Sequence, residues 1–144
     1  MVKKFKLAIE LVPATSWWNN MRSSFPRKVW DSIRKNSYLN HGYLCGICRQ
    51  SGRLNCHEIW EYNDRKRTQK LKGFIALCNM CHHIKHIGLA GILVRQGVLN
   101  YEQIVKHFMK INKCKREEFI SHLNESFAIW QERSKYKWEI NLGA

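Results

Sequence analysis

Hydrophobic and polar positions change their period several times along the chain, and each change marks an expected element. Residues 3–12 alternate in part between apolar and polar side chains, which predicts a strand. Apolar side chains then recur at helical spacing, which predicts a helix that carries Val29, Trp30, Ile33 and Tyr38. Pro26 suits the first turn of this helix, and Ser23 or Ser24 is its expected cap. We expect the helix to end near Gly42.

A pair of strand-like segments follows in the middle of the chain. Residues 53–62 and 69–77 are rich in strand-forming side chains, and the polar residues 63–68 separate them. We expect these segments to form a β-hairpin with a longer loop. The segment after the hairpin, residues 79–97, has a helical pattern that two glycines could break, Gly88 and Gly91.

The second half of the chain predicts two more helices and a final strand. Asn100 can cap the first helix, whose inner side carries Ile104, Val105, Phe108 and Met109. Residues 115–134 form the second, with a stripe of core side chains at Phe119, Ile120, Leu123, Phe127 and Trp130. The alternating residues 136–142 predict a strand that pairs with residues 3–12. The expected fold class is therefore α+β.

We expect all these elements to form one domain over residues 1–144, because no repeat, low-complexity tract or Pro-rich linker divides them. Residues 100–134 are its helical C-terminal part. A hydrophobic fraction of 44% is enough for a core and excludes a disordered chain.

The charge balance indicates a partner. The chain carries 25 Lys and Arg against 11 Asp and Glu, a net charge of +14, which favours a polyanion, nucleic acid first. A basic protein without such a partner is the alternative. No segment approaches the roughly 20 apolar residues of a membrane span, and Lys6 and Glu10 interrupt the N-terminal apolar run, which makes it a poor signal peptide. We therefore expect a cytoplasmic protein with no membrane partner.

Two C-x-x-C pairs are the most specific pattern in the sequence: Cys45 with Cys48, and Cys78 with Cys81. In a reducing compartment such cysteines indicate metal binding before disulfides, and two pairs are typical of a tetrahedral four-thiolate zinc site. A redox pair or unpaired thiols are the alternative. Because four thiolates fill the coordination shell of zinc, this ion would be structural and would take no part in catalysis.

Four histidines lie close to this zinc site in the sequence and are not needed as its ligands. His57 is on the first hairpin strand, while His82, His83 and His86 are in the following helix. His82 and His86 are four residues apart and share one helix face, so they can bind one metal ion. Two independent surface histidines are the alternative. Imidazole titrates near neutral pH, which suits His57 to general-base catalysis.

These motifs resemble the HNH, or ββα-metal, nuclease family over residues 43–88, which we expect to form a module within the domain. The matching segments are Cys45-x-x-Cys48, Cys56-His57-Glu58 and Leu77-Cys78-x-x-Cys81-His82-His83-x-x-His86. The Cys-His-Glu form looks like that of compact bacterial and phage members of the family. The resemblance implies a core of hairpin and helix stapled by a four-cysteine zinc. It also implies a metal-dependent endonuclease that hydrolyses phosphodiester bonds, in DNA before RNA.

The resemblance assigns roles to single residues. His57 would be the general base that deprotonates the attacking water. His82 would hold a catalytic divalent ion, Mg²⁺, Mn²⁺ or Zn²⁺, and the spacing makes His86 a possible second ligand. His83 would be exposed or lie behind the ligands.

Two positions depart from the family pattern. Cys56 stands where the family usually has a metal-binding Asp, and thiolate is a poor match for Mg²⁺. Gly73 stands where the family usually has an Asn. Glu58 could supply the missing carboxylate, although strand alternation places it opposite His57.

Basic residues flank the expected site and are candidates for phosphate contacts: Arg49, Arg53, Arg65, Lys66, Arg67, Lys70 and Lys72. A solvated loop is the alternative. Two functions therefore stand: a metal-dependent nuclease, and a catalytically inactive zinc-stapled nucleic-acid-binding subunit of a larger complex with protein partners. The histidines favour the first, and the two departures favour the second.

Overall fold

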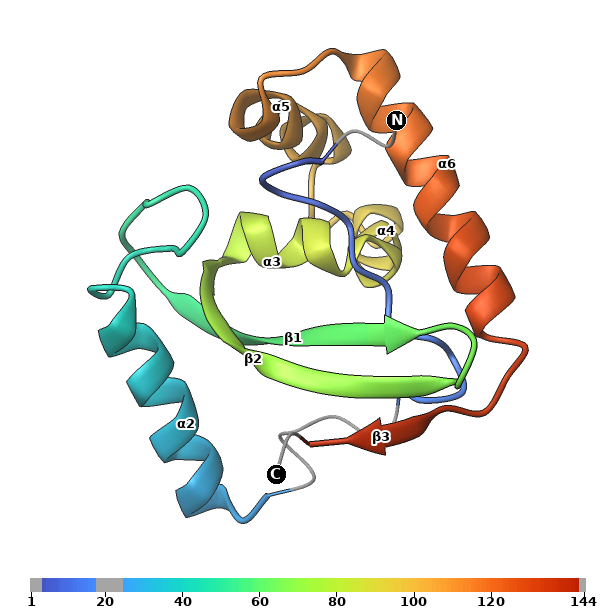
Figure 1. Cartoon of the computed structure of the whole chain (residues 1–144). Coiled ribbons are helices and arrows are strands. Elements are labelled where there is room, and N and C mark those ends of the chain that lie inside the picture. The colour runs from blue at the N-terminus through green and yellow to red at the C-terminus, as the bar shows by residue number, and fades with distance from the viewer. Residues whose placement is uncertain (1–3, 18–24, 143–144) are drawn as a thin grey trace.

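A β-hairpin lies at the centre of the structure, with helices on either side of it (Figure 1). The computed structural model describes residues 4–17 and 25–142. This part of the chain is α+β, with five helices and one three-stranded sheet, and none of these helices is long and apolar enough to cross a membrane. In chain order the elements are α2 (Arg27–Asn40), β1 (Leu54–Asn63), β2 (Thr68–Cys78), α3 (Asn79–Lys85), α4 (Ile87–Arg95), α5 (Tyr101–Asn112), α6 (Arg116–Arg133) and β3 (Glu139–Asn141).

The predicted hairpin is confirmed: β1 and β2 pair antiparallel over their whole length. Their register shifts beside Ile59, which lies opposite Gly73. Gly73 has a φ of +153°, a backbone conformation that residues other than glycine rarely adopt. Such a β-bulge increases the local twist, here just beyond His57 on β1.

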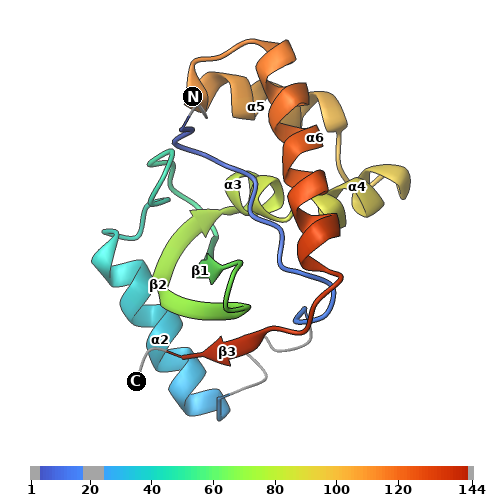
Figure 2. The ribbon, with the colours of Figure 1, turned by 45° about the vertical axis from the view of Figure 1, so that its right-hand side comes forward.

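The predicted pairing of the two termini is wrong. Residues 4–12 form no strand, because side chains of the C-terminal helices take their backbone hydrogen bonds. Asn112 of α5 accepts from the Leu7 N–H at 2.8 Å and donates to its carbonyl at 2.9 Å, and His122 Nε2 of α6 accepts from the Ile9 N–H at 2.9 Å. Figure 2 shows this segment running between α3 and α6. β3 pairs instead with the start of β2, in parallel.

The helical segment after the hairpin breaks at His86, before either of the two glycines that the sequence indicated. The Cys78 side chain caps α3 by accepting from the Cys81 N–H at 3.4 Å. His86 then leaves helical geometry, with φ −108° and ψ 53°, and α4 begins at the next residue. The break therefore falls on a residue of the candidate site.

Two other helix starts can be compared with their expected caps. Asn100 caps α5 as predicted, because its side chain accepts from the Gln103 N–H at 3.1 Å. α2 begins directly after Pro26, and its expected caps, Ser23 and Ser24, lie outside the described residues.

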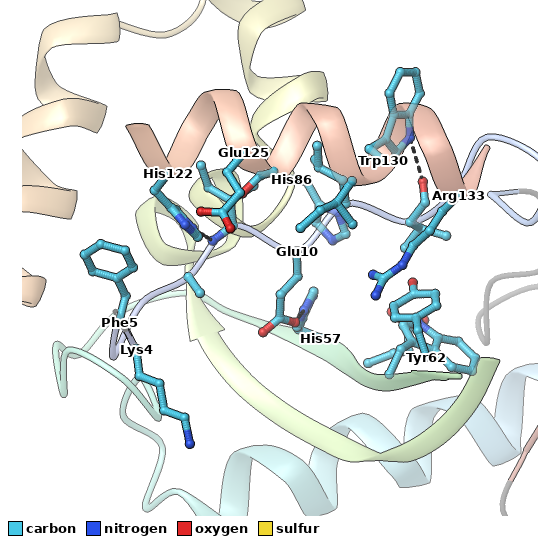
Figure 3. A pocket seen from close by; sticks show the side chains of 18 residues that line it. Lys4, Phe5, Glu10, His57, Tyr62, His86, His122, Glu125, Trp130 and Arg133 are labelled. Atoms are coloured by element: carbon cyan, nitrogen blue, oxygen red, sulfur yellow. Dashed lines mark hydrogen bonds and ion pairs between the residues drawn. The ribbon is translucent and has the colours of Figure 1, made fainter. Parts of the chain in front are cut away.

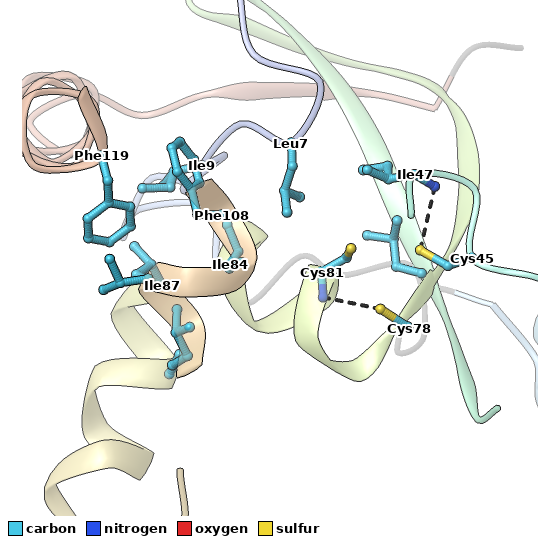
Figure 4. Close-up of a cluster of buried hydrophobic side chains, with 14 residues drawn as sticks. Leu7, Ile9, Cys45, Ile47, Cys78, Cys81, Ile84, Ile87, Phe108 and Phe119 are labelled. Carbon is cyan, nitrogen blue, oxygen red and sulfur yellow. Dashed lines mark hydrogen bonds between the residues drawn. The ribbon is translucent and has the colours of Figure 1, made fainter. Parts of the chain in front are cut away.

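The stripe predicted for α6 is buried only in part. Phe119 is fully buried, but Ile120 and Phe127 are 45% and 38% exposed. α6 lies at the edge of the molecule, so only one of its sides faces the interior (Figure 2). The core itself joins α3, α5, α6 and the N-terminal segment, and it continues into the cysteine cluster (Figure 4); its fully buried side chains include Leu7, Leu77, Ile84, Ile104, Val105, Phe108 and Phe119.

Candidate metal centres

The four cysteines of the two C-x-x-C pairs meet at one point. Cys45 and Cys48 come from the loop between α2 and β1, while Cys78 ends β2 and Cys81 lies in α3. Their four Sγ atoms all lie within 4.8 Å of one another, and Cys48 and Cys78 are 3.6 Å apart. Four sulfurs around a zinc ion at about 2.3 Å would be separated by about 3.8 Å. The cluster therefore could hold a metal ion.

Backbone and side-chain donors surround these sulfurs. The N–H groups of Ile47 and Cys48 point at Cys45 Sγ, each at 3.5 Å. His107 of α5 places Nε2 3.2 Å from Cys81 Sγ. Such donors stabilise thiolates and fix the direction of their lone pairs. No sequence pattern connects His107 with this cluster, because the contact depends on how α5 packs on α3.

Crowding of the thiols sets their protonation. Hydrogen bonds from Cys78 and Cys81 hold the pKa of the Cys45 thiol well below its usual range. The contact with Cys45 raises the pKa of Cys78 to about 11 and moves that of Cys81 well above its usual range. The Cys45 thiolate is thus stabilised by hydrogen bonds from the protonated thiols of Cys78 and Cys81. For these two thiols to ionise as well, a cation must lie between the sulfurs.

Three histidines form a second cluster beneath α3. His57 comes from β1, His82 from α3 and His86 from the break that ends α3, and one ligand nitrogen of each lies within 4.8 Å of the others. The ring centroids are 5.6 Å apart for His57 and His82, 5.0 Å for His57 and His86, and 4.8 Å for His82 and His86. The three imidazoles are close enough to share one ion.

The donor set fits a metal ion by a further test, its unsatisfied nitrogens. His57 is only 3% exposed. Both of its ring nitrogens, and Nδ1 of His86, are buried without a hydrogen-bond partner among the described residues. Buried polar groups in folded proteins nearly always have a partner, so these nitrogens indicate that a ligand belongs between them.

The protonation of the cluster also suits metal binding. Burial, followed by the proximity of His57, lowers the pKa of His82 to about 4. The same two causes lower the pKa of His86 to about 3. Both imidazoles are therefore neutral at pH 7, which is the form that binds metal ions.

A carboxylate reaches this cluster from the N-terminal segment. Glu10 Oε2 lies 3.5 Å from His57 Nε2, and Oε1 lies 2.6 Å from Nζ of the buried Lys85; Figure 3 shows Glu10 directed at His57. Burial opposes ionisation of Glu10, but the contact with His57 and the charge of Lys85 outweigh it and lower the pKa of Glu10 to about 2. The carboxylate is therefore charged at neutral pH.

A pocket of about 470 Å³ opens beside the histidines, between the N-terminal segment, β1 and α6 (Figure 3). Its polar lining includes Glu10, His57, Tyr62, His86, His122 and Arg133. The guanidinium of Arg133 is already paired with Asp64, at 2.9 Å, and lies over the ring of Tyr62. His57 and His86 form part of the wall of this pocket, although both ring nitrogens of His57 are buried.

Neither Cys56, which departs from the family pattern, nor Glu58, the expected replacement carboxylate, joins the histidine cluster. Glu58 is not among the three residues whose ligand atoms converge. Burial raises the pKa of the Cys56 thiol to about 11, and the thiol contacts the side chain of Ser37 in α2. As strand alternation predicts, Cys56 faces α2 while His57 faces α3. The carboxylate that contacts His57 is Glu10, and not Glu58.

The basic residues predicted to contact phosphates lie at the two ends of the hairpin. Six are exposed: Arg49, Arg53, Arg65, Lys66, Lys70 and Lys72. Arg67 differs, because its guanidinium lies 3.5 Å from the ring centroid of Tyr136 and it is half-buried. Arg67 therefore also ties the hairpin turn to the C-terminal segment.

Glu10 is the site residue that the sequence patterns missed. Its only signal is a single carboxylate within the apolar run LAIELV, and in the sequence this carboxylate indicates only that the run is a poor signal peptide. No protein-family model, curated protein or solved structure matches this chain. The resemblance to the HNH family therefore stays a prediction that rests on the motifs.

Proposed function

We propose that the protein is a metal-dependent endonuclease of the HNH type that hydrolyses phosphodiester bonds, with DNA as its preferred substrate. The observation that carries the proposal is the cluster of His57, which is buried, with the half-buried His82 and His86, beside an open pocket. The net charge of +14 supports a nucleic-acid substrate. Exposed Lys and Arg at both ends of the hairpin would neutralise phosphates on either side of the cluster.

In this proposal the four cysteines bind a structural Zn²⁺. Four thiolates complete the tetrahedral shell of zinc and leave no position for substrate. The ion would join the loop before β1 to the start of α3 and so fix the helix that carries His82. The second cluster has three nitrogen donors, which leaves room for substrate or water.

A divalent ion bound at the histidines would supply a positive charge that stabilises the phosphorane-like transition state and the leaving oxygen. His82 and His86 would hold this ion. The motif predicts His57 as the base that takes a proton from the attacking water. The position of His57 against the other two imidazoles also suits direct metal binding, and either role makes cleavage depend on His57.

The alternative, a catalytically inactive zinc-stapled nucleic-acid-binding subunit, has two observations in its favour. The N-terminal segment and Glu10 cover His57, which is only 3% exposed. The cluster also lacks the carboxylate that the family pattern expects on β1, because Cys56 occupies that position and faces away from the histidines. A subunit of this kind would bind DNA without cutting it.

Cleavage assays separate the two functions. Plasmid DNA, single-stranded DNA and RNA are incubated with the protein and Mg²⁺, Mn²⁺, Ni²⁺ or Zn²⁺ in turn, beside His57→Ala and the control His83→Ala. We expect cleavage by the parent and by His83→Ala, and a loss of at least about 100-fold in His57→Ala. DNA binding on a gel without cleavage under any metal would refute the endonuclease and support the alternative.

A further inference from the structure

We propose that His57, His82 and His86 together coordinate one divalent cation of the zinc class, and that Glu10 is the carboxylate that orients His57 toward it. The proposal names the ligands of the ion on which the proposed endonuclease rests. Metal binding tests it whether or not the protein cleaves nucleic acid.

Three observations place His57 among the ligands. Its ligand nitrogen and those of His82 and His86 all lie within 4.8 Å of one another. It is 3% exposed, so water cannot satisfy its nitrogens. Neither nitrogen has a hydrogen-bond partner among the described residues. Glu10 Oε2 approaches Nε2 at 3.5 Å, and an ion would satisfy Nδ1, which a free imidazole base would leave buried without a partner.

Glu10 supplies what metal-binding histidines commonly have behind them. A ligand histidine usually donates its second N–H to a carboxylate or carbonyl, which fixes the tautomer and the ring. Glu10 Oε2 lies 3.5 Å from His57 Nε2, which leaves Nδ1 for the ion. Lys85 Nζ, at 2.6 Å, and the hydrogen bond from the Glu10 N–H to the Lys85 carbonyl, at 3.2 Å, hold Glu10 in place.

A role for Glu10 as the counter-ion of Lys85 alone would not require the contact with His57. Lys85 is 6% exposed and needs a negative partner, so part of the effect of Glu10 is structural. The two carboxylate oxygens divide these tasks, because Oε1 contacts Lys85 and Oε2 contacts His57. The two tasks are separated by a substitution that keeps the shape of the Glu10 side chain and removes its charge, with metal affinity as the measured quantity.

The donors select the class of ion. Three imidazole nitrogens suit Zn²⁺, Co²⁺ and Ni²⁺, whereas Mg²⁺ requires oxygen ligands. No carboxylate belongs to the group of converging ligand atoms among the described residues. The structure therefore favours zinc and its analogues over magnesium at this centre. Trp17, whose ring lies 5.7 Å from that of His86, covers another side of the cluster.

The test uses the full chain with one equivalent of Zn²⁺ at the cysteines and Co²⁺ as the probe for the second site. We expect one Co²⁺ to bind with visible d–d bands and without the thiolate-to-cobalt charge-transfer bands of a cysteine site. His57→Ala and His86→Ala should each weaken this Co²⁺ at least about 100-fold. The matched control His83→Ala, on the same helix but outside the cluster, should keep it.

Folding of each variant is checked within the same experiment. When Co²⁺ is offered to metal-free protein, the cysteine site gives charge-transfer bands with the parent affinity only if the central module can fold around the ion. Failure of the parent chain to bind a second Co²⁺, or an unchanged second affinity in His57→Ala, overturns the three-histidine site. A second ion without cleavage contradicts the endonuclease alone, and cleavage that still requires an added divalent metal, in a chain that binds no second Co²⁺, contradicts this site alone.

Glu10 is tested by Glu10→Gln, with Glu125→Gln as the control because Glu125 is another carboxylate of the same pocket. We expect Glu10→Gln to weaken the second Co²⁺ by about 10–100-fold, the usual effect of removing a group behind a ligand. Glu125→Gln should leave the affinity unchanged. Equal affinities in Glu10→Gln and the parent chain would leave Glu10 as a partner of Lys85 only.

Discussion

Gly73 illustrates how a single residue can depart from a family pattern for a physical reason. The resemblance predicted Asn at this position, and its absence counted against catalysis. In the structure Gly73 lies at the bulge between β1 and β2, with a φ of +153°. Side chains are strained in this conformation whatever the space around them. The glycine therefore serves the backbone of the hairpin, and its identity is not evidence of a decayed site.

We predict that Gly73→Ala lowers the free energy of unfolding by about 1–3 kcal/mol, the usual cost of a strained backbone conformation. A new Cβ would meet no atom within 4 Å, so crowding does not contribute. Gly91→Ala is the control, because Gly91 lies inside α4 and also has open space. It should be neutral or stabilise by up to about 1 kcal/mol. Urea denaturation measures both, and equal effects would contradict the role of the bulge.

At the scale of elements, the N-terminal segment is what the hydrophobic pattern misassigned. Residues 3–12 alternate like a strand, yet the described part is an extended segment that binds side chains of α5 and α6. Alternation reports that one side of a segment is buried, and it does not identify the partner that satisfies the backbone. The distinction matters here because this segment carries Glu10 to the histidines.

We predict that Asn112→Ala releases the N-terminal segment, because Asn112 makes both hydrogen bonds to Leu7. Buried backbone groups left without partners cost about 1–3 kcal/mol. The affinity of the second metal site should also fall, since Glu10 would lose its fixed position. Asn124→Ala, at an exposed position of α6, is the control and should change stability by less than about 0.5 kcal/mol. Chemical denaturation and the Co²⁺ titration measure the two effects, and a stable Asn112→Ala with normal affinity would refute the anchor.

At the scale of the whole molecule, the cysteine cluster joins elements that lie far apart in the chain. It connects the loop before β1 to the start of α3, and its side chains belong to the same buried cluster as Leu7 and Phe108 (Figure 4). Metal binding at such a site is part of the folding free energy, because the unfolded chain has no formed site.

We predict that a strong chelator, or Cys45→Ser, unfolds the central module and releases one Zn²⁺ per chain. Four-cysteine sites stabilise small folds to a degree that makes the metal-free form unstable. Cys114→Ser is the control, since Cys114 is not one of the four converging cysteines. Circular dichroism and elemental analysis give the result, and a Cys45→Ser chain with full zinc content and unchanged melting would exclude the site.

The proposed nucleic-acid binding would also depend on the whole surface. We predict that the logarithm of the DNA affinity falls linearly with that of the salt concentration, because bound cations are released from the phosphates. Lys70→Gln and Lys72→Gln should each weaken binding and reduce the slope by about 1. Lys110→Gln, an exposed position on α5 away from the hairpin, should not. A slope that does not change with Lys70 or Lys72 would remove the hairpin from the DNA interface.

Features that depend on neighbours along the chain could be predicted from the sequence. It predicted the hairpin, the cap of α5 and the two C-x-x-C pairs, because strand alternation, helix capping and metal-ligand spacing are local properties. It also separated His57 from Cys56 onto opposite faces of a strand.

Which distant groups meet depends on the tertiary structure. In it the N-terminal segment contacts a C-terminal helix and not a sheet, the helix after the hairpin ends at His86, and Ile120 and Phe127 of α6 are partly exposed. The tertiary structure also brings Glu10 to His57, and His107 to Cys81, contacts that span many residues of chain. Such contacts are set by how helices pack on the hairpin, and a pattern read along one chain carries no information on packing partners.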